Sequence, residues 1–154
     1  MRTSFRDKAS YGKRVEYMII SKMLMEGMDV YVPLVDDHGV DCVVKKADGT
    51  FVEVQIKATS KNCDTRYCAM FSAIWHEKTP NYYFVFYSET LDTIWLLSSE
   101  EFVSLSSQSS SGKNKGQRAI QFNGCRTDKN TKEKIPYCSE KYKQFICTNF
   151  DRIK

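Results

Sequence analysis

The chain has 154 residues, of which 42% are hydrophobic and 13% aromatic. This composition suffices for a packed core and excludes an intrinsically disordered chain, and the length favours a single domain over residues 1–154. No apolar run approaches the ~18 residues of a membrane helix, and the amino-terminal end is charged from Arg2 onward, unlike a signal peptide. We therefore expect a cytoplasmic protein that has no membrane partner.

The net charge of +4 is spread unevenly along the chain. Residues 111–154 hold 11 basic and 4 acidic side chains, whereas residues 1–110 hold 12 basic and 15 acidic ones. A basic carboxyl-terminal segment suits a polyanion such as DNA, although a solvated lysine-rich surface has the same composition.

The six cysteines contain no CxxC pair, and neither histidine stands at metal-site spacing from them. The chain is also long enough to bury a core without covalent cross-links. We therefore expect reduced, mostly packed thiols rather than disulfide bonds or a zinc site.

The amino-terminal part of the chain predicts a helix followed by a short strand. Apolar residues recur at the helical period over residues 7–26, and Gly27 is a natural helix stop. Residues 29–34 predict a strand, within which Pro33 indicates a sheet edge or a strand end.

Residues 39–58 predict a β-hairpin whose register follows from its apolar residues. Apolar side chains must share the buried face, and a slip by one residue would turn them all outward. The pairing that keeps them together is residue 44 with 52, 42 with 54 and 40 with 56. It leaves a three-residue loop ending at Gly49, which supplies the left-handed conformation that such loops need. A two-residue turn at 48–49 would mix the two faces, and we reject it.

The other face of this hairpin carries a cluster of polar residues. Glu53, Gln55 and Lys57 alternate along the second strand, and the register places Asp41 directly opposite Gln55. A solvated outer face would explain such alternation as well. Apolar side chains share this face, however, which favours a covered face with a polar pocket. Carboxylate and carboxamide oxygens are ligands suited to Mg²⁺, and a lysine beside a metal can orient or deprotonate water.

The rest of the chain predicts further strands and helices, so that the whole is an α/β fold. In chain order these are a strand over 71–75, a buried strand over 82–89, its hairpin partner over 92–98, a capped helix over 99–105, a mobile serine- and glycine-rich loop over 106–117, a strand over 118–122, a polar loop over 125–138 and a helix from residue 139 onward. Trp75 and Trp95 are expected in the core, and His38 and His76 are expected in surface loops.

The helix and the hairpin together resemble the PD-(D/E)XK nuclease superfamily, which has the restriction-endonuclease-like fold. That family carries a glutamate on a helix, an aspartate on a strand and a (D/E)-x-K motif on the next strand. The corresponding residues here are Glu16, Asp41 and Gln55-Ile56-Lys57. The resemblance covers about residues 12–60 and includes features of small Holliday-junction-resolvase-like and homing-type nucleases.

The resemblance implies a mixed central sheet flanked by helices and a metal-dependent DNA endonuclease that hydrolyses phosphodiester bonds. It implies that Asp41, Gln55 and the backbone carbonyl of Ile56 bind Mg²⁺ or Mn²⁺. Glu16 would hold an outer-sphere water or a second metal, and Lys57 would be the catalytic lysine.

Three positions depart from the family pattern. Val40 stands where proline is usual, and Gln55 stands where Asp or Glu is usual. Glu53 lies one strand period earlier and would assist Asp41 as a metal ligand. In an alternative motif, Glu53-Val54-Gln55, Glu53 would be the second carboxylate and Gln55 would replace the lysine. The cross-strand match favours the motif that ends at Lys57.

The basic carboxyl-terminal segment supplies candidates for contacts with the DNA backbone. These are Lys113, Lys115 and Arg118, together with Lys61 after the hairpin. Cutting both strands or a junction would imply a symmetric homodimer. Two alternatives stay open: a non-catalytic nucleic-acid- or partner-binding module that retains the nuclease fold, which Gln55 supports, and a plain interaction domain with a polar hairpin face.

Overall fold

The computed structural model describes residues 8–35 and 38–154, which form a mixed α/β fold. Within this part of the chain the α-helices are α1 (Lys8–Met25) and α2 (Ser99–Leu105), and the short 3₁₀ helices are η1 (Thr65–Tyr67), η2 (Glu140–Phe145) and η3 (Asp151–Ile153). The strands are β1 (Asp29–Tyr31), β2 (Cys42–Lys45), β3 (Phe51–Thr59), β4 (Met70–Ile74), β5 (Tyr82–Ser88), β6 (Thr93–Ser98), β7 (Ser107–Gln108), β8 (Arg118–Gln121), β9 (Asn123–Thr127) and β10 (Lys134–Cys138). No helix of the described residues is long and apolar enough to span a membrane.

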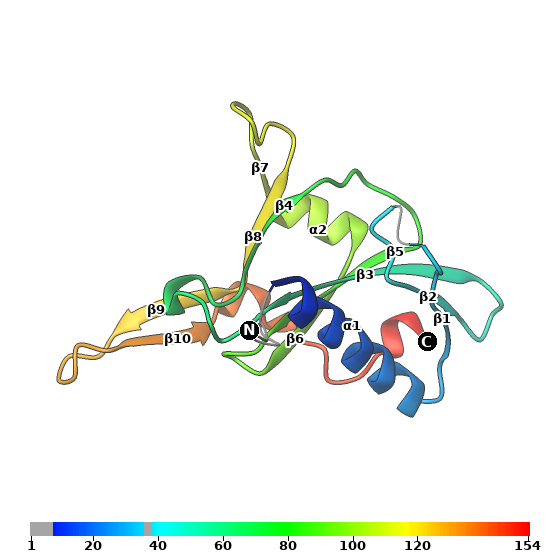
Figure 1. Ribbon diagram of the computed structural model, residues 1–154, viewed down its shortest axis with the longest axis horizontal. Helices are drawn as coiled ribbons and strands as arrows, with labels where there is room; N and C mark the ends of the chain where they lie inside the picture. The colour runs from blue at the N-terminus through cyan, green and yellow to red at the C-terminus, as the bar shows by residue number, and fades with distance from the viewer. Residues whose placement is uncertain (1–7, 36–37) are drawn as a thin grey trace, which may run out of the picture.

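A five-stranded mixed sheet forms the centre of the molecule, with the strand order β1-β2-β3-β5-β6 (Figure 1). β3 runs parallel to β5, whereas the other neighbouring strands are antiparallel. A parallel pair needs a crossover connection, and the segment through η1 and β4 supplies it. The expected mixed central sheet is confirmed, and the strands predicted over 82–89 and 92–98 are β5 and β6.

Helix α1 lies against one face of this sheet (Figure 1). Its side chains Val15, Ile19 and Met23 form one core with Val54 and Ile56 of β3. Burying an aliphatic side chain stabilises a fold by about 1.5–3 kcal/mol, so this core holds β3 firmly against the helix. The predicted helix is confirmed, and its predicted start at residue 7 lies outside the described residues.

The opposite face of the sheet is covered by α2 and by a second sheet with the order β4-β8-β7. The core on this side is aromatic, with Phe84 and Phe86 of β5 packed against Phe102 of α2. Ser98 caps α2 in a reciprocal capping box with Glu101, which satisfies two amide groups at the helix start. The predicted capped helix is therefore confirmed.

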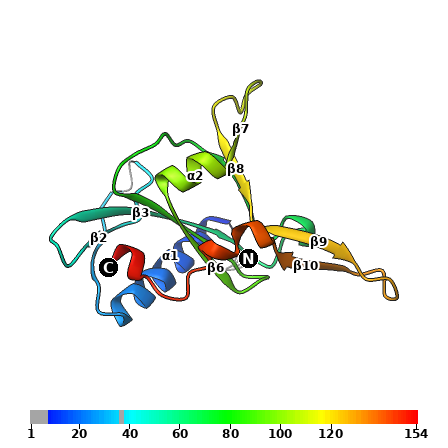
Figure 2. The same ribbon diagram turned by 180° about the vertical axis from the view of Figure 1, so that it is seen from behind.

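Two hairpins project from the body in different directions (Figure 2). One joins β7 to β8, and its turn is closed by the backbone N–H of Ser109 donating to the carbonyl of Gln117 at 2.9 Å. The other joins β9 to β10, so the prediction of a polar loop over 125–138 is wrong. Lysine, aspartate and asparagine have low strand propensity, so the composition of this segment favours a loop. The pairing of β9 with β10 is supported instead by contacts at the base of the hairpin, such as the bond between Asn123 and Ala69.

The predicted carboxyl-terminal helix is also wrong, because the residues from 139 form η2 and η3 instead. Ile146 forms a β-bridge with Trp95, which is fully buried as predicted. The backbone N–H of Cys147 donates to the carbonyl of Ile94 at 2.8 Å. These tertiary bonds hold the backbone in an extended conformation after η2. They override the helix that the spacing of the apolar residues in the tail favours.

Candidate active site

The hairpin of β2 and β3 forms two of the three predicted pairs. The third, residue 40 with 56, does not form because the paired register ends at Cys42, and Val40 packs with the aromatic core on the pocket side. Cys42 pairs with Val54, and Val44 pairs with Val52. All four side chains are buried in the core beneath α1. Because side chains alternate along a strand, the polar residues between them point to the opposite face.

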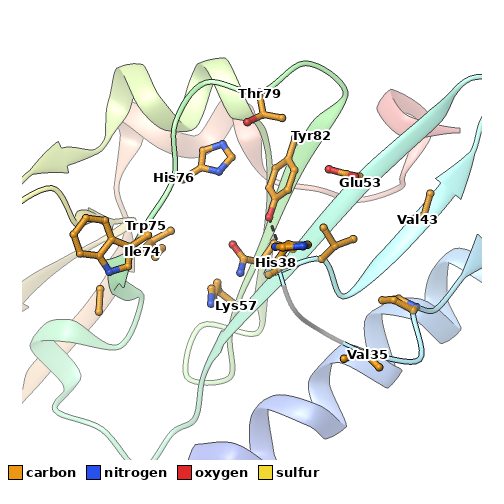
Figure 3. A pocket seen from close by; sticks show the side chains of 15 residues that line it. Val35, His38, Val43, Glu53, Lys57, Ile74, Trp75, His76, Thr79 and Tyr82 are labelled. Carbon is orange, nitrogen blue, oxygen red and sulfur yellow. Dashed lines mark hydrogen bonds between the residues drawn. The ribbon is translucent and has the colours of Figure 1, made fainter.

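The polar side chains of β3 line a pocket of about 970 Å³ on that opposite face (Figure 3). Glu53, Gln55 and Lys57 come from β3, and Trp75 and Tyr82 line the same pocket. Ligand pockets have volumes of roughly 300–1,000 Å³, so this one has room for a group of nucleotide size.

Asp41 lies where β2 departs from β3. The paired register ends at Cys42 and Val54, and the backbone N–H of Asp41 donates to the carbonyl of Val54 at 2.9 Å. The carboxylate oxygen Oδ2 accepts the backbone N–H of Ile56 at 2.6 Å, and the residue is only 9% exposed. The ladder therefore stops short of the expected pairing of Asp41 with Gln55, but the carboxylate is fixed to the residue after Gln55.

Gly39 and Gln55 are in close contact beside Asp41. Gly39 has a φ of +69°, and a Cβ atom there would lie 2.5 Å from Nε2 of Gln55. The hydroxyl of Tyr82 donates to the carbonyl of Gly39 at 2.9 Å (Figure 3). Only glycine suits both the left-handed backbone and the carboxamide packed against it.

Glu16 approaches the same end of the hairpin from α1, on the side of the sheet away from the pocket. Its side chain is 17% exposed, and its carboxylate forms an ion pair with Lys13. The hydrogen bond to Glu16 is the main cause that raises the pKa of Lys13, and the charges of Glu16 and Asp41 add to it. The pKa of Cys42 is raised to about 12, chiefly by burial and further by the same two carboxylates. The charges of Glu16 and Asp41 therefore act on the same two groups, Lys13 and Cys42.

Lys57 and Glu53 extend into the pocket from β3. Among residues 8–35 and 38–154, neither side chain has a hydrogen-bond or ion-pair partner. A lysine and a carboxylate without partners among these residues are accessible to a ligand, so the pocket face carries available groups of both charges.

Two further residues of the pocket differ from their predictions. Trp75, expected in the core, is 66% exposed, because the register of β4 shifts where Ala73 has a φ of +59°. His76, expected on the surface, is half-buried with its Nε2 2.7 Å from Oγ of Ser99. Burial lowers the pKa of His76. No local sequence signal marks this histidine, since its partner lies 23 residues away.

The basic residues predicted to contact DNA differ in their exposure and in their hydrogen bonds within the protein. Lys113 and Lys115 are exposed in the turn between β7 and β8, and Lys61 is exposed after β3. Arg118 is half-buried, and its guanidinium donates to two backbone carbonyl oxygens at 3.0 and 3.3 Å. The three lysines are therefore more accessible to a ligand than Arg118 is.

The oxygen atoms around Asp41 suit a hydrated magnesium ion better than a closed metal cage. In the part of the chain that the structure describes, no three His, Cys, Asp or Glu side chains converge to hold a metal ion. The candidate oxygens are the carboxylate of Asp41, which is held on the Ile56 backbone, the carbonyl of Ile56, the carboxamide of Gln55 on the pocket side, and the carboxylate of Glu16 on the α1 side. Mg²⁺ binds to one or two carboxylates, substrate phosphates and several waters, so this donor set fits it chemically.

No protein-family model matches this sequence, and no curated protein matches it. Among solved structures, the fold is similar to that of a bacterial homing endonuclease, I-Ssp6803I, with a TM-score of 0.55. The two chains share 20% sequence identity, and the match covers 91% of this chain and 86% of that chain. The likeness shows a nuclease-like α/β fold over nearly the whole chain.

Proposed function

We propose that this protein is a metal-dependent DNA endonuclease of the PD-(D/E)XK type, which hydrolyses phosphodiester bonds. One observation carries the proposal: the carboxylate of Asp41 is fixed on the backbone of Ile56, next to the pocket that Gln55 and Lys57 line. The similarity of the fold to that of a homing endonuclease supports it.

Asp41, Gln55 and the carbonyl oxygen of Ile56 would hold Mg²⁺ or Mn²⁺, and Glu53 would be an assisting carboxylate. A bound divalent ion supplies a more acidic water and a positive charge beside the phosphate. The bond from the Ile56 N–H holds the Asp41 carboxylate in place before any ligand arrives. Such fixed ligands lose little conformational freedom on binding.

Lys57 is the residue that would contact the scissile phosphate. Its ammonium group would donate to a phosphate oxygen or orient the attacking water, and would stabilise the charge that develops in the transition state. Glu16, on the other side of the sheet, would hold an outer-sphere water. Lys61, Lys113, Lys115 and Arg118 would contact phosphates of the DNA backbone, and cutting both strands would require a homodimer.

The test is cleavage of plasmid, linear duplex and branched DNA in Mg²⁺ or Mn²⁺, with EDTA as the metal-free control. Asp41→Asn is the matched variant, because an asparagine carbonyl can still accept the Ile56 N–H while the charge is lost. We expect cleavage by the wild type that disappears in EDTA and in Asp41→Asn. Equal cleavage by the variant and the wild type would contradict the site.

Gln55 favours a second candidate function, a non-catalytic DNA- or partner-binding module on the same fold. A neutral carboxamide replaces a carboxylate there, and no group of three acidic, histidine or cysteine side chains converges among the described residues. This candidate predicts that wild type and Asp41→Asn bind duplex DNA alike, that neither cuts it, and that Mn²⁺ binding does not depend on Asp41.

A further inference from the structure

The ribbon formed by β9 and β10 projects from the body of the molecule (Figures 1 and 2). At ~3.3 Å per residue its paired strands extend about 17 Å, and the turn lengthens it further. Asn123 at its base is buried, but every residue over 124–138 is at least partly exposed. The ribbon therefore contributes little to the core, and its length calls for an explanation other than stability.

Hydrogen bonds hold the ribbon in place at both ends. At its base, Oδ1 of Asn123 accepts the backbone N–H of Ala69 at 3.1 Å. At its tip, Oδ1 of Asp128 accepts the backbone N–H groups of Asn130 and Thr131, each at 2.8 Å. A segment whose conformation is fixed in advance loses less entropy when it binds a partner.

The exposed surface of the ribbon is positively charged. Its basic residues are Arg126, Lys129, Lys132 and Lys134, and its acidic residues are Asp128 and Glu133. None of the four basic side chains forms an ion pair with another described residue. Elsewhere on the surface, Lys13, Lys78 and Arg152 are neutralised by ion pairs.

One face of the ribbon also carries an arginine and a tyrosine side by side. Tyr137 pairs with Gly124, and Arg126 pairs with Ile135 at the next position on the same face. The Tyr137 ring lies directly on Gly124, since a Cβ atom there would be 2.4 Å from the ring. Both Tyr137 and Arg126 are exposed, and arginine is the side chain that most often contacts guanine in the major groove.

We propose that the β9–β10 ribbon is a DNA-binding arm that enters the major groove of duplex DNA. The major groove is ~12 Å wide and admits a two-stranded ribbon. Lys129 and Lys132 at the turn contact phosphates, and Arg126 lies on the face that meets the base edges. The inference takes DNA as the partner from the proposed function but requires no cleavage.

The test compares two double variants that each remove two positive charges. Lys129→Gln with Lys132→Gln changes the tip of the ribbon, and Lys22→Gln with Lys45→Gln changes two exposed lysines on α1 and β2. Binding of a fluorescent 30-base-pair duplex is measured by anisotropy in EDTA over a range of salt concentrations. For the ribbon variant we expect an affinity about tenfold weaker and a slope of log affinity against log salt that is smaller by about 2. Equal behaviour of the two variants, or no binding by the wild type, would overturn the proposal.

Binding to duplex RNA of the same sequence tests whether the ribbon enters the major groove. The major groove of A-form RNA is deep and narrow and does not admit protein side chains, so we expect the ribbon variant to lose affinity for DNA more than for RNA. An equal loss on both would contradict entry into the major groove.

A cleavage assay distinguishes the two proposals. Binding through the ribbon without cutting would refute the nuclease alone, and cutting with unchanged affinity in the ribbon variant would refute the arm alone.

Discussion

The two faces of β3 differ in what their side chains do. Toward α1 the strand presents aliphatic side chains, of which Val54 is fully buried. Toward the pocket it presents Glu53, Gln55 and Lys57, and the first and last of these have no partner among the described residues. Polar groups without partners add little to stability. One strand therefore stabilises the fold through one face, whereas two polar side chains of its other face are not used by the described part of the fold.

Lys57→Met should reduce DNA cleavage more than any other substitution on β3, because methionine keeps the apolar stem but lacks the ammonium group. We expect the rate of DNA cleavage to fall about 100-fold or more, with the free energy of unfolding changed only slightly. Cleavage rates and urea unfolding curves of the two proteins check this. A variant that cuts DNA normally, or one that loses stability instead, would break the distinction between the faces.

Val54→Ala should show the opposite pattern on the other face. Removing two methyl groups from a fully buried site leaves a cavity, so we expect the free energy of unfolding to fall by about 2 kcal/mol. At a temperature where the variant is still folded, its cleavage rate should match that of the wild type. Unchanged stability in urea unfolding would show that the face toward α1 is not the stabilising one.

Gly39→Ala tests whether the close approach of Gly39 to Gln55 matters for cleavage beyond the backbone strain of a positive φ. Alanine in the left-handed region costs about 1–2 kcal/mol, and the new Cβ atom would also collide with the carboxamide, so we expect that loss of stability and a clear loss of cleavage. Gly49→Ala is the matched control, because Gly49 also has a positive φ, +84°, but has no atom within 4 Å of the added Cβ. Cleavage that falls equally in both variants would show that the contact with Gln55 does not matter.

A smaller effect is expected in the pH dependence of the free energy of unfolding, to which His76 in the pocket lining contributes. Burial lowers the pKa of His76 below its ordinary value of 6.5, so the unfolded chain binds the proton more readily than the folded chain does. Its contribution to stability is therefore complete above about pH 7 and is lost as the pH falls through the lowered pKa. We expect the free energy of unfolding to fall more between pH 7.5 and 5.5 in the wild type than in His76→Gln. Equal changes in the two proteins would contradict this.

The elements that depend on local sequence patterns could be predicted from the sequence. The alternation of apolar residues sets the register of β2 and β3, and the helical period sets α1. The pocket on the polar face of the hairpin was also foreseeable, because apolar and polar side chains share that face. The helix and the hairpin register depend on residues that are close in the chain, whereas the pocket is completed by distant residues such as Trp75 and Tyr82.

The remaining features depend on contacts between distant residues, and the sequence predicted them poorly. The ribbon of β9 and β10 is anchored by the bond between Asn123 and Ala69, 54 residues apart. The tail departs from a helix because Ile146 bridges to Trp95. At the site, the hydrogen bond from Ile56 to Asp41 replaces the regular pairing that the hairpin alone would suggest.

In the proposed function, Asp41 and the pocket face of β3 hold a divalent metal for DNA cleavage. A calorimetric titration of Mn²⁺ into the wild type and into Asp41→Asn tests this directly. We predict that the wild type binds Mn²⁺ and that the variant binds it at least about tenfold more weakly. Equal binding by both proteins, or no binding by the wild type, would contradict the claim.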